Sequence, residues 1–71
     1  MAMQTTFDRG QFVACIFPVN GIDPTHVFRV LKVEYEFGGY VQVLHIQDVE
    51  TGAFMDRAGY FAWRFRRTAA P

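Results

Sequence analysis

The stretch Val27-Phe-Arg-Val-Leu-Lys-Val-Glu-Tyr-Glu36, with Phe37-Gly38-Gly39 directly after it, decides the fold of this chain. β-Branched and aromatic residues alternate with charged ones along it, which is typical of a strand with one buried face. The step from Val30 to Val33 is odd, and an odd step moves a side chain to the other face of a strand. We therefore predict a β-bulge near Leu31, followed by a tight hairpin in which the paired glycines supply positive φ angles.

Residues 40–48 return as the partner strand of this hairpin. Their apolar phase also slips, from Val41 and Val43 to Leu44 and Ile46. Matched irregularities in two paired strands are what a strongly coiled small barrel requires. The hairpin therefore predicts a curved sheet.

Three further short strands complete the pattern. They are expected at residues 11–17, 53–56 and 61–67. The first is apolar at consecutive positions, as in a strand covered on both faces. The last alternates Phe61, Trp63 and Phe65 with small or basic residues, and such an alternation places the three rings on one face of a strand. No long stretch has the 3.6-residue period of a helix, and closure removes exposed edges, so we predict an all-β, five-stranded barrel.

The segments outside these strands define the domain limits. Residues 1–10 form a polar, partly mobile leader that ends in an Asp8-Arg9-Gly10 turn, residues 11–67 form the single barrel domain, and residues 68–71 form a frayed tail. Residues 18–26 contain two prolines and an Asn-Gly pair, so they are expected to be a long loop. Within it, Asp23 is placed to cap one short helical turn that begins at Pro24.

Composition limits both the size and the partners of the protein. A chain of 71 residues has room for one domain, and its 17% aromatic content provides large apolar area for a small core. Seven basic and seven acidic side chains cancel, so no overall field draws the protein onto nucleic acid or an anionic membrane. The charge is nevertheless uneven: from Arg57 onward there are four arginines and no carboxylate, whereas five carboxylates lie between residues 34 and 56.

The single cysteine, Cys15, excludes a disulfide within the chain and favours a reducing, cytoplasmic location. Residues 1–10 are too polar for a targeting segment, and no apolar run approaches the roughly 20 residues that cross a bilayer. We therefore expect no membrane partner.

The order of these features resembles a group of short bacterial and bacteriophage proteins with SH3-like barrels. The resemblance covers residues 11–66, and this chain has Arg66 where the group usually has an acidic residue. The matching pieces are Cys15-Ile16, Phe28-Arg-Val-Leu-Lys-Val33, Val41-Gln-Val43, Thr51-Gly52 and Phe61-Ala-Trp-Arg-Phe65. The resemblance implies an SH3-like barrel, and it implies that the protein binds a host protein or nucleic acid.

Catalysis by the thiol would need an imidazole beside it. Cys15 could act as a nucleophile if His26 or His45 lowered its pKa. It lies inside an apolar strand, however, where a free thiol behaves as a small hydrophobic side chain. A metal site made from these residues with Asp23 or Asp48 lacks any Cys-x-x-Cys or His-x-x-x-His spacing.

The remaining chemical motifs also have structural explanations. Asp48 and Glu50 flank a turn, where solvated carboxylates are common. Gly38-Gly39 precedes a strand, whereas a phosphate-binding loop would precede a helix. The sequence therefore predicts no enzyme, no cofactor and no metal.

The region from Arg57 to Arg67 is the predicted binding surface. If the three rings of residues 61–65 point inward, Arg64 and Arg66 point outward together. Arginines beside an exposed ring can contact phosphates and stack on bases, or they can anchor a protein interface. The predicted site residues are Arg57, Tyr60, Trp63, Arg64, Arg66 and Arg67.

Three interpretations of this region stay open. The arginines solvate a barrel edge and pair with Glu34, Glu36 or Asp56, or they bind a protein, or they bind nucleic acid. Our leading hypothesis is a non-enzymatic binding module, a phage-type accessory protein that binds a host protein and modulates its activity. The alternatives are a small nucleic-acid-binding barrel and a homo-oligomer joined through an open edge strand, so monomer and homodimer are both open. The loop of residues 18–26 is the other possible binding surface.

Overall fold

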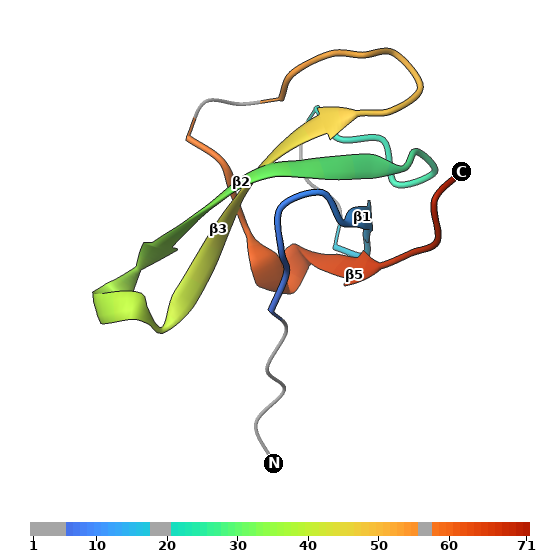
Figure 1. Cartoon of the computed structure of the whole chain (residues 1–71). Coiled ribbons are helices and arrows are strands. Elements are labelled where there is room, and N and C mark those ends of the chain that lie inside the picture. Colours follow the sequence, from blue (N-terminus) through green and yellow to red (C-terminus); the bar gives the residue numbers. More distant parts are fainter. Residues whose placement is uncertain (1–5, 18–20, 56–57) are drawn as a thin grey trace.

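The computed structural model describes residues 6–17, 21–55 and 58–71. Five strands form one antiparallel sheet in the order β4-β3-β2-β1-β5 (Figure 1). The elements are β1 (Phe12–Cys15), β2 (Phe28–Glu36), the 3-10 turn η1 (Phe37–Gly39), β3 (Val41–Asp48), β4 (Tyr60–Phe61), the 3-10 turn η2 (Ala62–Arg64) and β5 (Phe65–Arg67). The described residues contain no α-helix, so the all-β prediction is confirmed. Within them β4 and β5 are sheet edges that do not pair, so the sheet is not closed.

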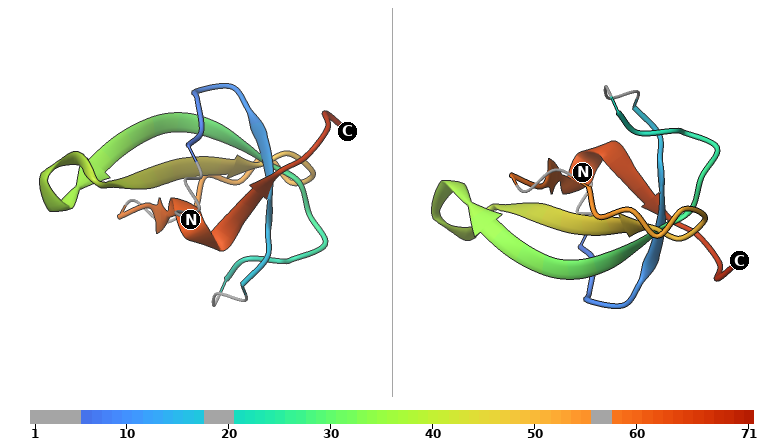
Figure 2. Two further views of the ribbon diagram at one scale, coloured as in Figure 1. Left: turned by 90° about the horizontal axis from the view of Figure 1, so that it is seen from below. Right: turned by 90° about the horizontal axis from the view of Figure 1, so that it is seen from above.

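The β2–β3 hairpin is the longest pairing in the sheet. It runs from Glu36 opposite Val41 to Phe28 opposite Asp48, and its register shifts between Val30 and Lys32. This shift confirms the predicted bulge beside Leu31. The two strands curve together across the molecule (Figure 2), as strands do when an extra residue increases their twist.

The end of this hairpin is a 3-10 turn in which residues 37–40 connect the paired residues Glu36 and Val41. Gly38 and Gly39 have φ angles of 67° and 94°, which confirms the reason for the glycine pair, and Phe37 also has a positive φ of 54°. The Tyr40 N–H donates to the Phe37 carbonyl oxygen at 3.3 Å and closes the turn.

The core lies beneath the sheet and extends into the predicted leader. The Phe7 N–H donates to Gln42 Oε1 at 2.7 Å, and Gln42 Nε2 donates back to the Phe7 carbonyl at 3.2 Å. The predicted domain start at residue 11 therefore leaves out a core residue. The buried apolar cluster consists of Phe7, Val13, Cys15, Ile22, Phe28, Val30, Leu44, Ile46, Ala62 and Phe65.

The last third of the chain differs most from the prediction. Where a strand was expected at residues 53–56, the described part shows a single bridge between Phe54 and Gln47, and β4 forms later, opposite Val43 and Leu44. The predicted strand at 61–67 is interrupted by η2. The chain has to pass from β4 at one edge of the sheet to β5 at the other, and the 3-10 turn makes that change of direction.

In the loop before β2, Asp23 caps a hydrogen-bonded turn, and the helical turn predicted from Pro24 does not form. Asp23 Oδ1 accepts hydrogen bonds from the Thr25 N–H and the Thr25 hydroxyl at 2.8 and 2.6 Å. The His26 N–H donates to the Asp23 carbonyl at 3.1 Å, which completes the turn. No helix among the described residues is long and apolar enough to span a membrane.

Candidate functional site

An aromatic and basic surface forms where β1 ends beside η2. The Ile16 N–H donates to the Arg64 carbonyl at 2.8 Å, and the Phe17 N–H approaches the same oxygen at 3.4 Å. The rings of Phe17 and Trp63 then meet edge to face, with centroids 5.6 Å apart and planes at 62°. We call Ile16, Phe17, Trp63, Arg64 and Arg66 the Trp63 surface.

Trp63 is the centre of this surface. The sequence left both an inward and an exposed Trp63 open, and the structure has the exposed one: η2 breaks the two-residue period, and Trp63 is 51% exposed while Phe65 stays in the core. The Arg64 guanidinium carbon lies 4.4 Å from the Trp63 ring centroid, a cation–π contact. Ile16 and Phe17 are also about half exposed. Three large apolar side chains gathered at one place on a small domain are typical of an interaction site.

The arginines of the Trp63 surface have no carboxylate partner. Within the described ranges, every ion pair involves His26, Lys32 or His45, so neither Arg64 nor Arg66 is paired there. Glu34, which was one predicted partner, is bonded instead to Lys32 and His45. Asp56, another predicted partner, lies outside the described residues. Arg64 and Arg66 therefore keep their hydrogen-bonding capacity for an external anion.

Two other predicted site residues, Tyr60 and Arg67, make contacts elsewhere. Tyr60 is half-buried and packs its ring edge on Phe65, at a centroid distance of 6.2 Å. Arg67 donates to the Thr6 carbonyl and lies 5.8 Å from the centroid of the Phe7 ring, so it holds the N-terminal segment. Arg57 lies outside the described residues.

Ile16 and Phe17 were not predicted as site residues. Both belong to the apolar run that precedes Pro18, and the whole run was expected to be a buried strand. The structure ends β1 at Cys15, so the last two residues of the run are left on the surface. The place of the proline in the sequence was the available signal, because a proline has no N–H to donate to a β-ladder.

Cys15 is a buried residue of the core. Its thiol donates to the Phe17 carbonyl at an Sγ to oxygen distance of 2.8 Å, while both histidines are bonded to carboxylates. The thiol therefore has no imidazole hydrogen bond in the described structure.

We expect Cys15 to resist alkylation in the folded protein. Burial keeps a reagent such as iodoacetamide from reaching the sulfur. Mass spectrometry should find labelling complete in denaturant and slow in buffer. Rapid labelling of the native protein would contradict the buried position.

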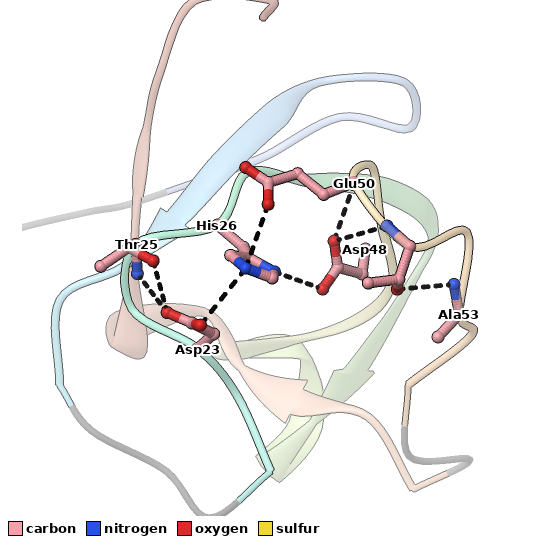
Figure 3. A network of polar contacts seen from close by, with 7 residues as sticks. Asp23, Thr25, His26, Asp48, Glu50 and Ala53 are labelled. Carbon is pink, nitrogen blue, oxygen red and sulfur yellow. Dashed lines mark hydrogen bonds and ion pairs between the residues drawn. The ribbon is translucent and has the colours of Figure 1, made fainter.

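The densest polar cluster in the described chain surrounds His26 (Figure 3). Its Nδ1 lies 2.8 Å from Asp48 Oδ2, and its Nε2 lies 3.0 Å from Glu50 Oε2 and 3.2 Å from Asp23 Oδ2. We call these four residues the His26 network. It joins the loop before β2 to the turn after β3, as does the hydrogen bond from the Val49 N–H to the Val27 carbonyl.

The His26 network favours the protonated, charged form of His26. The hydrogen bond with Asp48 raises the pKa of His26 above 6.5, partial burial opposes this, and the charges of Asp23, Asp48 and Glu50 add to it. Burial acts to raise the pKa of Asp48, but hydrogen bonds from His26 and from the Glu50 and Thr51 N–H groups together lower it below 3.8. An imidazolium that donates from both nitrogens satisfies the surrounding carboxylates.

This network does not form a metal-binding arrangement. Among the described residues, no group of three or more His, Cys, Asp and Glu side chains has a geometry that could hold a metal ion. The positions of its members, at the base of two loops, suit a structural link.

Comparison with protein-family models, with curated proteins and with solved structures finds no match to this chain. The functional argument therefore rests on the chemistry of the Trp63 surface.

Proposed function

We propose that the protein is a non-enzymatic binding module, with the sheet of an SH3-like barrel, that docks an acidic and apolar segment of a partner protein on the Trp63 surface. One observation carries the proposal: a half-exposed tryptophan lies between an apolar neighbour, Phe17, and an arginine without a carboxylate, Arg64. The resemblance to phage-type proteins suggests that the partner is a host protein whose activity is modulated.

The apolar half of the surface provides the affinity. Burial of apolar area is favourable by about 25 cal/mol per Å². Tryptophan and arginine are the residues most enriched among those that dominate protein interfaces. Edge-to-face packing on Phe17 and the stacked Arg64 hold the Trp63 ring in place, so little side-chain entropy is lost on binding.

The basic half provides the selection. An arginine that has no carboxylate partner within the described part of the chain favours a carboxylate on the binding partner. Hydrogen bonds between charged groups are stronger than those between neutral groups. Arg66 adds a second positive charge on the neighbouring strand β5. A partner segment that alternates acidic and large apolar residues matches both halves.

Nucleic acid is the second candidate. The Arg64–Trp63 pair could place a phosphate beside a base that stacks on the indole. The zero formal charge of the chain and the apolar flank of Ile16 and Phe17 favour the protein partner over this one.

The test reverses the two charges. The double variant Arg64→Glu, Arg66→Glu should bind the partner at least about tenfold more weakly, and Trp63→Ala should cost about 2 kcal/mol or more of binding free energy. Arg9→Glu is the matched control, because Arg9 is exposed and lies in the Asp8–Gly10 turn, away from Trp63 in sequence. Partners are recovered from host lysate by quantitative affinity capture, and affinities are then measured by calorimetry.

Three outcomes are decisive. A protein retained by the wild type and by Arg9→Glu, and lost by the double variant, supports the proposal. Equal retention by the double variant would place the site elsewhere, and the loop before β2 would then be the next surface to test. A labelled single-stranded oligonucleotide that binds at low salt, with an affinity falling steeply as salt rises, would support nucleic acid instead.

A further inference from the structure

A second exposed aromatic surface lies at the end of the β2–β3 hairpin. Its side chains are Tyr35, Phe37 and Tyr40, and the last two are 70% and 88% exposed. We call residues 35–40 the hairpin tip. It projects from one end of the molecule, and β5 runs toward the opposite end (Figure 2). A projecting segment of this kind is suited to contact another molecule.

The hairpin tip is acidic. Glu34 and Glu36 are the only charged residues between positions 33 and 44. Glu34 is bonded to Lys32 and His45. Glu36 has no ion pair with any residue in the described ranges. The tip therefore presents one uncompensated carboxylate beside exposed rings.

Phe37 has a strained backbone conformation. A positive φ is sterically unfavourable for a bulky side chain, and glycine would adopt it freely. The ring contacts Phe61 at a tilted 33° and a centroid distance of 6.3 Å, but most of it faces solvent. Such strain is typical of binding sites, where a contact outside the chain uses the strained residue.

We propose that the hairpin tip of one copy docks on the Trp63 surface of a second copy. This inference rests on the proposed function, because it names an occupant of the same surface. The tip has the chemistry that the surface selects: Glu36 faces the free guanidinium groups of Arg64 and Arg66, and Phe37 and Tyr40 face the apolar flank. A chain with zero formal charge also lacks the net repulsion that keeps copies apart.

The contact joins two different surfaces, so it is heterologous. Contacts of this kind close into rings or extend as chains. It also occupies the surface on which the partner protein docks. Self-association and partner binding are therefore mutually exclusive, and a high concentration of the protein weakens its own partner binding.

The experiment measures self-association by sedimentation velocity from the micromolar to the millimolar range. The wild type should form larger species as its concentration rises. Glu36→Arg, and separately Arg64→Glu with Arg66→Glu, should each weaken association at least about tenfold. An equimolar mixture of these two variants should associate again, because the reversed tip of one variant faces the reversed surface of the other, and the native Glu36 tip of the double variant faces the native arginines of Glu36→Arg. Asp8→Arg and Arg9→Glu are the exposed, charge-matched controls and should behave as the wild type does.

The outcomes separate the two proposals. A wild type that stays monomeric throughout overturns the self-association and leaves the proposed function standing, whereas a double arginine variant that keeps its partner overturns the proposed function. Association that neither variant weakens, or that the mixture fails to restore, overturns the contact between tip and surface. Phe37→Gly provides a second test: it removes the strained ring and should weaken association while circular dichroism shows the native fold.

Discussion

Gly59→Ala is expected to destabilise the protein by about 2–5 kcal/mol, the largest effect of an alanine at any of the six glycines. The total free energy of unfolding for a domain of this size is about 4–10 kcal/mol. The substitution therefore removes a large part of the stability.

Two separate causes add at Gly59. Its φ of 78° is a left-handed conformation that costs an alanine about 1–2 kcal/mol. A β-carbon there would also lie 2.5 Å from Val43 Cγ1 and 3.1 Å from the Leu44 carbonyl oxygen. Val43 is buried, and its branched side chain has few other rotamers, so it cannot move away. The crowding adds about 1–3 kcal/mol.

Gly52→Ala is the matched control. Gly52 has nearly the same φ, 77°, but nothing lies within 4 Å of its added β-carbon. It should lose only the cost of the left-handed conformation, about 1–2 kcal/mol. Urea unfolding of the three proteins, followed by circular dichroism, measures both losses. Equal losses for the two variants would show that β3 and the start of β4 do not approach as closely as described.

The periodic parts of the fold were predictable because their cause is local. The odd step from Val30 to Val33 required a bulge, and Gly38-Gly39 required a tight turn, whatever the rest of the chain did. The position of β4 depends instead on a distant part of the chain, because β4 pairs with Val43 and Leu44 of β3. The burial of Phe7 depends on Gln42, which is 35 residues away. Contacts of that range leave no mark in a local pattern.

The site was predicted in part for the same reason. The basic and aromatic character of residues 63–66 was visible in the sequence, but the outward turn of Trp63 results from η2, which the alternating pattern hid. The three carboxylates of the His26 network come from the loop before β2, the end of β3 and the turn after it, which the sheet brings together. Asp48 lies 22 residues from His26, so only the fold unites them.

The stability of the protein is expected to fall as the pH rises through the pKa of His26 in the folded state. The folded pKa of His26 is raised above its ordinary 6.5, so its contribution is complete below pH 6.5 and is lost above the raised value. The pKa of Asp48 is lowered below 3.8, so its contribution is present above that value and is lost in stronger acid. The two windows overlap between pH 3.8 and 6.5, where the His26 network is intact.

The measurement is the urea midpoint across the range from about pH 5 to pH 9, which spans the titration of a histidine. The wild type should lose stability toward the alkaline end, and His26→Gln should lose much less because no imidazolium forms. His45→Gln leaves the His26 network in place and should keep the slope of the wild type.

The sign of the change in stability with pH shows whether the carboxylates interact with a charged imidazolium or only lie near the ring. Carboxylates approach both nitrogens of His26, from the loop before β2, the end of β3 and the turn after it. A neutral imidazole carries one proton, so it would leave a nitrogen facing a carboxylate with no hydrogen between them. Deprotonation therefore removes the hydrogen bond between His26 and at least one of these carboxylates. Stability that is constant or rises between pH 6.5 and pH 9, or an imidazole NMR titration below 6.5, would show that these carboxylates do not act on the ring together.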